Sequence, residues 1–189
     1  PDEEALFTYT NPKSAIAINQ QNKYAYNYTN AISLEWKPVK GLVLRTEATL
    51  SLNWKDQYRF WGALTGEGTK NNSLPVASIQ KDQSFNYIWT NTASYGFSIK
   101  YKHTFSMLLG QEIYHSQNKK NFQKNRYFPR AFEAGQAWDN MGFGTPQEST
   151  SSLSTPDRTA SFFGQASYNY NHKYLLSVTM RADGSTKFA

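Results

Sequence analysis

Apolar and polar residues alternate along two neighbouring stretches near the start of the chain. In residues 24–36 and again in 42–54, even-numbered positions are mainly aromatic or aliphatic, while odd-numbered positions are mainly small, polar or charged. Successive side chains of a β-strand point to opposite faces, so each stretch predicts a strand with one apolar face. Residues 37–41 (KPVKG) separate the two stretches and have the composition of a turn. The pattern predicts a hairpin whose strands are longer than the usual five or six residues.

The same alternation predicts four further strands. Apolar residues occupy every second position in the ranges 85–101, 105–113, 160–170 and 174–182. Short turns are expected at 101–104 and 171–173. Stretches rich in Gly, Asn, Pro and Ser predict a loop over residues 1–21 and long loops over 55–81 and 115–157. Short and long connections therefore alternate along the chain.

Two properties of the apolar positions indicate a membrane barrel. The six apolar columns contain no Asp, Glu, Lys or Arg, although 18% of the chain is charged. A mid-depth Arg or Lys on the lipid face of a barrel costs about 2–4 kcal/mol, which explains such an exclusion. Aromatic residues also gather at the column ends, as in interfacial girdles; at the long-loop side these are Tyr24, Tyr26, Trp54, Phe85 and Tyr87, and at the short-turn side Trp36, Tyr101, Tyr168, Tyr170 and Tyr174.

The expected fold class is therefore all-β. We expect a transmembrane antiparallel up-and-down β-barrel segment of about six strands, with short periplasmic turns and long extracellular loops. The alternative that the pattern leaves open is a soluble antiparallel sandwich, which also alternates. In functional terms that alternative is a secreted all-β carbohydrate-binding or adhesion module.

Composition excludes several classes of protein. The chain has no cysteine, so disulfides and thiolate metal sites are excluded. Its net charge is +6, but the basic residues are scattered, and we expect no nucleic-acid partner. The longest uninterrupted apolar run is Ala15–Ile18, far short of the roughly 20 residues that a spanning helix needs.

The sequence shows no constellation of residues suited to catalysis. The glycines between Gly62 and Lys70 miss the phosphate-loop spacing, which needs Gly directly before Lys. His103, His115 and His172 have no spacing suited to a metal. We therefore expect no enzyme, no cofactor and no metal.

One stretch carries a family resemblance. Residues 158–189 contain SFFG at 161–164, YxY at 168–170, KYLL at 173–176 and RADGS at 181–185. This stretch resembles a hairpin typical of the SusC/RagA family of TonB-dependent outer-membrane transporters, and residues 109–112 (LGQE) and 38–42 (PVKGL) are weaker matches. Gln165 stands where many members carry Arg.

The resemblance implies a barrel of about 22 strands, plugged by an amino-terminal domain. It further implies energisation by the TonB complex, a SusD-like surface lipoprotein, and a location in the outer membrane of a Gram-negative cell. Transporters of this kind import oligosaccharides or peptides. Because six strands do not close such a barrel and no plug is recognisable, we expect residues 1–189 to be a partial barrel domain cut at both ends.

Two groups of residues are candidates for function. Loop aromatics suit substrate contact or docking of the lipoprotein, although loops that pack on themselves use the same residues; these are Phe60, Trp61, Tyr127, Phe128 and Trp138. Charges on the faces opposite the apolar columns suit a water-filled lumen, where they would hold the wall to the plug or to each other; these are Arg45, Glu47, Glu112, Arg181 and Asp183.

Overall fold

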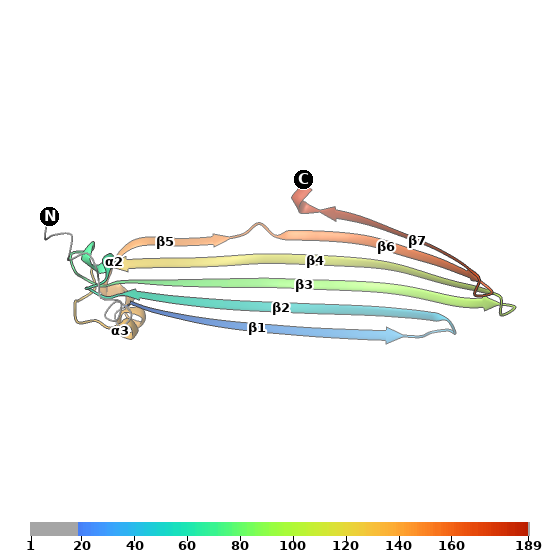
Figure 1. Cartoon of the computed structure of the whole chain (residues 1–189), viewed down its shortest axis with the longest axis horizontal. Helices are drawn as coiled ribbons and strands as arrows, with labels where there is room; N and C mark the ends of the chain where they lie inside the picture. Colours follow the sequence, from blue (N-terminus) through green and yellow to red (C-terminus); the bar gives the residue numbers. More distant parts are fainter. Residues whose placement is uncertain (1–18, 189) are drawn as a thin grey trace, which may run out of the picture. The chain divides into compact units, whose positions relative to one another are not determined.

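The computed structural model describes residues 19–188, which form one seven-stranded antiparallel sheet (Figure 1). The strand order is β1-β2-β3-β4-β6-β7, and β5 also pairs with β4. The strands are β1 Asn19–Trp36, β2 Leu42–Trp61, β3 Val76–Ile99, β4 His103–Arg126, β5 Thr145–Leu153, β6 Asp157–Tyr170 and β7 Tyr174–Ser185. The helical turns are α2 Gly66–Thr69, α3 Ala134–Asp139, η2 Met141–Phe143 and η3 Thr186–Phe188. None of these helices is long and apolar enough to span a membrane.

The described residues fall into two compact units. The first, here called the loop unit, comprises residues 19–26, 53–83 and 118–153. The second, here called the turn unit, comprises residues 27–52, 84–117 and 154–188. Each is described separately below.

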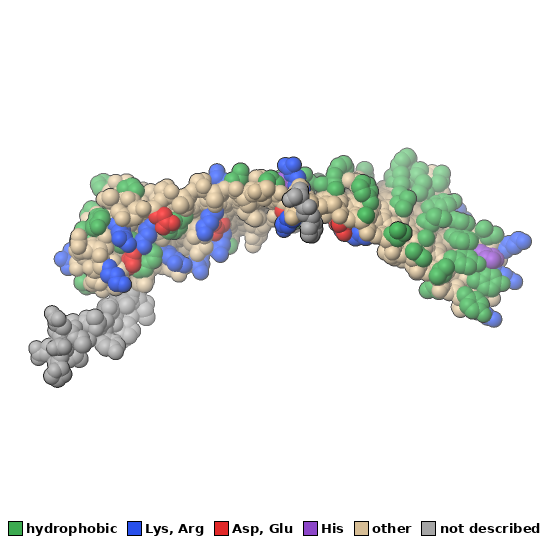
Figure 2. Space-filling view, turned by 90° about the horizontal axis from the view of Figure 1, so that it is seen from above, with side chains coloured by type: hydrophobic (Ala, Val, Ile, Leu, Met, Phe, Trp, Pro, Cys, Tyr) green, Lys and Arg blue, Asp and Glu red, His purple; other side chains and the backbone are tan. Residues whose placement is uncertain are grey.

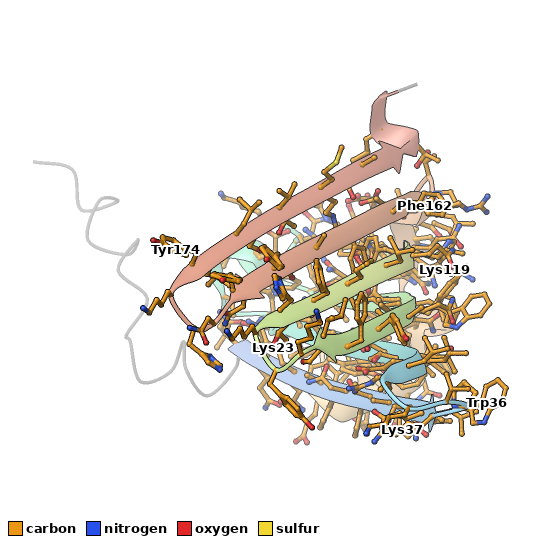
Figure 3. The ribbon with its side chains drawn as sticks, turned by 90° about the vertical axis from the view of Figure 1, so that its right-hand side faces the viewer. Lys23, Trp36, Lys37, Lys119, Phe162 and Tyr174 are labelled. Carbon is orange, nitrogen blue, oxygen red and sulfur yellow. The ribbon has the colours of Figure 1, made fainter. Side chains whose placement is uncertain are left out.

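The turn unit has the apolar face that the sequence predicts. Strand pairing places Phe105 opposite Tyr168, Leu109 opposite Gly164, and Gly164 opposite Met180. Directly opposed residues of an antiparallel pair share a face, so the apolar columns of β4, β6 and β7 lie on one side. Hydrophobic side chains gather on that side in Figure 2, and Figure 3 shows Trp36 and Phe162 projecting from the same side. These side chains are open to the surroundings, with Leu109 68% exposed.

Three polar residues of the apolar columns, Thr46, Asn91 and Gln111, form hydrogen bonds across the strands. Trp89 Nε1 donates to Thr46 Oγ1 at 2.9 Å, which joins β3 to β2. Asn91 Nδ2 donates to Gln111 Oε1 at 3.1 Å, which joins β3 to β4. A polar group costs free energy away from water unless it is paired, so these bonds fit a face without water.

Tight turns close the hairpins of the turn unit. Gly41 ends the β1–β2 turn at φ +87°, a conformation that side chains rarely adopt. Its carbonyl accepts a hydrogen bond from the Gly96 amide of β3 at 2.9 Å, and a Cβ on Gly41 would collide with the Gly96 carbonyl. Glycine is therefore needed at position 41 for both conformation and space.

The loop unit packs a small core beside the sheet. Its buried members are Phe60, Ala77, Phe128, Ala134 and Ala137. Phe132, Trp138 and Met141 pack against this cluster. Residues from a strand end, a loop and α3 thus form one cluster, which gives the connections a defined structure.

The predicted loop boundaries are wrong in three places. Strand β2 continues to Trp61 and β3 begins at Val76, so the first long connection is 62–75. Strand β4 continues to Arg126 and pairs with β5 over residues 145–153, so the second is 127–144. Strand β1 begins at Asn19, and the rest of the loop expected over 1–21 lies outside the described residues. These extensions carry polar residues on both faces and so lack the regular apolar alternation that predicts a strand, while backbone hydrogen bonds to neighbouring strands form whatever the side chains are.

Candidate functional site

A charged network on the polar face joins four strands of the turn unit. Strand pairing places Glu112 of β4 opposite Ser161 of β6, and Ser161 opposite Asp183 of β7. Arg181 Nη2 donates to Glu112 Oε1 at 3.1 Å and to Ser161 Oγ at 3.0 Å, while its Nε donates to Asp183 Oδ1 at 2.9 Å. Thr90 Oγ1 of β3 donates to Glu112 Oε2 at 3.3 Å. The structure therefore brings together three of the five charges that the sequence singles out.

The other two predicted charges form a separate pair. Arg45 Nη2 donates to Glu47 Oε2 within strand β2. The two residues are separated by one position, so their side chains share a face. Both are partly open to solvent, and pairs of this kind contribute little to stability.

Two of the predicted contact aromatics lie in the core of the loop unit. Phe60 is 4% exposed and Phe128 is 0% exposed. The expectation that these two rings are exposed is therefore wrong. The loops fold over their own apolar residues, which is the alternative that the sequence left open.

The other three aromatics are at least partly accessible. Tyr127 is 42% exposed. Trp138 is half-buried: its Nε1 donates to the Arg59 carbonyl at 3.1 Å, and its ring lies 5.6 Å from that of Tyr58. Trp61 is the last residue of β2 and is half-buried, with Lys124 Nζ 5.4 Å from its ring centroid.

A pocket of about 310 Å³ lies on the polar face of the loop unit around Trp61. Alternation brings its lining residues to one face of the sheet; they are Gln57, Arg59 and Trp61 of β2, Ser78 and Gln80 of β3, Phe122 and Lys124 of β4, and Glu148 of β5. Basic and acidic side chains lie close together over this unit (Figure 2). Of these eight residues the sequence reasoning singled out only Trp61. The available signal was the odd-numbered column of β2, which continues unbroken from residue 43 to 61.

One carboxylate beside this pocket forms ion pairs with two cations. Glu67 of α2 accepts a hydrogen bond from Lys124 Nζ at 2.7 Å and lies 3.5 Å from Arg126 Nη2. The hydrogen bond from Lys124 lowers the pKa of the Glu67 carboxyl below its usual value, and the charges of Lys124 and Arg126 act in the same direction. Arg59 forms no ion pair with any residue of the described part of the chain.

The Glu67 ion pair makes the loop unit sensitive to acid. A carboxyl group whose pKa is lower in the folded state than in the unfolded state stabilises the fold at every pH above the unfolded-state pKa. This stabilisation is lost as the pH falls through the folded-state pKa. Glu67→Gln is expected to destabilise the loop unit by about 1 kcal/mol at pH 7 and to have no effect at a pH low enough to protonate Glu67 in the folded wild-type protein. Tryptophan fluorescence during heating measures both conditions.

The matched control is Asp56→Asn, which removes a carboxylate that has no ion-pair partner in residues 19–188. It is expected to leave the unfolding temperature unchanged at pH 7. An equal destabilisation by Glu67→Gln at both pH values would contradict the role given to the ion pair.

The fold defines the class of the protein. It is a segment of a transmembrane antiparallel up-and-down β-barrel, and within residues 19–188 the sheet stays open between β1 and β7. No protein-family model matches the chain. No group of three or more His, Cys, Asp or Glu among the described residues is placed to hold a metal ion.

Among curated proteins, the chain is similar to TonB-dependent receptors. The chain is similar to TonB-dependent receptor P26 of Formosa agariphila, with 26% identity over an alignment that takes in 100% of this chain and 19% of the receptor. It is also similar to TonB-dependent receptor SusC of Bacteroides thetaiotaomicron, with 20% identity over 95% of this chain and 17% of SusC. The chain therefore spans about a fifth of the length of these relatives.

The structural comparison agrees with the sequence comparison. The RagAB peptide transporter matches with a TM-score of 0.76 at 18% identity, over 89% of this chain and 18% of that chain. The RagAB peptide importer in its closed-closed state matches with a TM-score of 0.75. At this identity the likeness shows a shared fold. Together with the curated relatives, it confirms the resemblance to the SusC/RagA family.

Proposed function

We propose that this chain forms part of the wall of a TonB-dependent importer in the outer membrane of a Gram-negative cell. The importer takes up oligomeric nutrients, either oligosaccharides or peptides, by gated passage and without catalysis. The observation that supports this most strongly is the open antiparallel sheet with one charge-free apolar face, whose fold matches that of RagAB.

The open sheet supports a larger barrel. Strands β1 and β7 end the strand order, and each leaves one edge without a partner strand in the described part of the chain. Unpaired backbone groups do not persist in lipid, so a membrane-spanning sheet must close. We infer that residues 1–189 are a partial barrel domain and that further strands complete a barrel of about 22 strands.

The exposed apolar face disfavours a soluble binding module. Large side chains of the turn unit are open to the surroundings, with Leu34 67% and Met180 74% exposed. Soluble monomers rarely expose apolar patches of such extent, whereas a lipid bilayer solvates them. We therefore take the lipid bilayer as the partner of this face.

The remaining partners follow from the family resemblance. We propose that a SusD-like lipoprotein covers the extracellular side and that the TonB complex acts through a plug region. Tyr127, Trp61 and Trp138 are the predicted aromatics accessible for contact with the lipoprotein or the substrate.

Two measurements test this function. The denatured chain extracted from its source membrane is expected to have a mass several times 21.6 kDa, because the relatives are about five times longer. Uptake of its nutrient is expected to stop when TonB is deleted. A mass near 21.6 kDa in a buffer-soluble fraction would refute the importer.

We further propose that the polar-face charges line the lumen and that Arg181 ties β7 to β4 and β6. Arg181→Ala removes the bonds to Glu112, Ser161 and Asp183 and is expected to lower the temperature at which the folded barrel unfolds in detergent. Arg158→Ala is the matched control, because Arg158 forms no ion pair within residues 19–188. Unchanged unfolding and transport in Arg181→Ala would remove this role.

A further inference from the structure

The pocket around Trp61 combines an aromatic ring with a cation that has no ion-pair partner among residues 19–188. Arg59 is exposed at the pocket and forms no ion pair within the described residues, whereas Lys124 is held by Glu67. Guanidinium groups bind carboxylates through two parallel hydrogen bonds, which gives them both strength and orientation. The available charge in this pocket therefore favours a carboxylate close to Arg59.

The ring beside Arg59 is held in place by its neighbour. Lys124 Nζ lies over the Trp61 ring at 5.4 Å, and the same Nζ is fixed by Glu67 at 2.7 Å. An aromatic ring attracts a cation to one face and leaves the rest of its apolar surface for contact with sugars or side chains. A ligand with a carboxylate at Arg59 would place its adjoining apolar part on Trp61.

Glu148 limits where a carboxylate can lie. This exposed residue of β5 lines the same pocket, and its Cα is paired with that of Lys124 across the β4–β5 ladder. Like charges repel, so Glu148 favours one carboxylate on the Arg59 side and disfavours a second on its own side. Removing its charge should therefore strengthen the binding of an anionic ligand.

We propose that this pocket binds a carboxylate-bearing unit of the transported oligomer through Arg59 and Trp61. The proposal rests on the importer function given above and makes the nutrient anionic. The carboxylate belongs either to an acidic sugar or to an acidic amino acid, since both present the same group to a guanidinium.

The test is calorimetry on the protein purified in detergent from the outer membrane of its source. The probes are trigalacturonate with its neutral counterpart trigalactose, and triglutamate with its neutral counterpart trialanine. One carboxylated probe is expected to bind more tightly than its neutral counterpart, and the pair that shows this identifies the source of the carboxylate. Arg59→Gln is expected to weaken that binding about tenfold or more, the loss typical of a hydrogen-bonded charge.

Two further variants keep the outcome clear. Glu148→Gln is expected to tighten binding of the same probe, a gain that misfolding does not produce. Lys119→Gln changes a charge at an odd-numbered position of β4, on the face opposite Lys124, and is expected to leave binding unchanged. Equal affinity for carboxylated and neutral probes, unchanged affinity in Arg59→Gln, or no binding of either carboxylated probe would overturn the proposal.

Uptake measured in cells separates this proposal from the importer function. If uptake of a neutral oligomer depends on TonB but is unchanged by Arg59→Gln, the proposal about the pocket is overturned and the importer function stands. If the purified protein binds carboxylated probes selectively but uptake does not depend on TonB, the importer function is overturned and the proposal about the pocket stands.

Discussion

Phe128→Ala is expected to reduce the free energy of local unfolding of the loop unit by about 3–5 kcal/mol. The Phe128 side chain has no exposed surface and lies in one cluster with Phe60, Ala77, Ala134 and Ala137. Its ring also lies within 6.3 Å of the Phe132 ring, measured between centroids. Truncation would leave a cavity, and the three alanines of the cluster offer few atoms with which to refill it.

Hydrogen exchange of the loop-unit amides measures this effect, because local opening is reported even when the barrel stays folded. The informative amides are those of Phe128, bonded to the Pro75 carbonyl, and Ala137, bonded to the Glu133 carbonyl. They are expected to exchange at least about a hundred times faster in the variant. Phe143→Ala is the control, since that ring is 66% exposed; equal acceleration in both variants would contradict the core described here.

Gly110→Val is expected to destabilise the turn unit by about 1–3 kcal/mol through crowding. Gly110 of β4 lies opposite Phe163 of β6, and a Cβ on this glycine would collide with the Phe163 ring. Displacing the ring also removes the platform for Arg181, whose Cζ lies 5.7 Å from the ring centroid. One substitution thus disturbs both the aromatic cover of a glycine and the charged network beside it.

A double-mutant cycle identifies this mechanism. In a Phe163→Ala background the collision is gone, so Gly110→Val is expected to cost little there. Gly96→Val is the control, because a Cβ at that position meets only the Phe105 carbonyl at 3.8 Å. Unfolding in urea measures all four proteins of the cycle, and additive costs would contradict the contact.

The sequence predicts those parts of the fold in which one face of a strand differs from the other. The pairing of Leu109 with Gly164 and of Gly164 with Met180 places together columns that alternation had already identified. The extensions of β2 to Trp61 and of β4 to Arg126, and all of β5, carry polar residues on both faces. These strands are identified by their hydrogen bonds to neighbouring strands, which a local sequence pattern does not predict.

The candidate residues show the same limit. Arg181 and Asp183 are separated by one position, so their shared face could be predicted, whereas the bond to Glu112 depends on strand register. Phe60 and Phe128 stand in polar stretches that resemble open loops, and only folding shows that they meet. The odd-numbered column of β2 includes Arg59, but the column does not distinguish Arg59 from its neighbours, because its importance comes from a partner that Lys124 has and Arg59 lacks within the described residues.

The paired amides on the apolar face bear on how the barrel assembles. Asn91 and Gln111 share a hydrogen bond across β3 and β4 on the face for which we propose the lipid bilayer as partner, where water would not replace either amide. Sliding one strand past the other would leave both amides bare in hydrocarbon, so the bond penalises every incorrect alignment. The amide pair would therefore favour the native register of β3 and β4 while the barrel assembles.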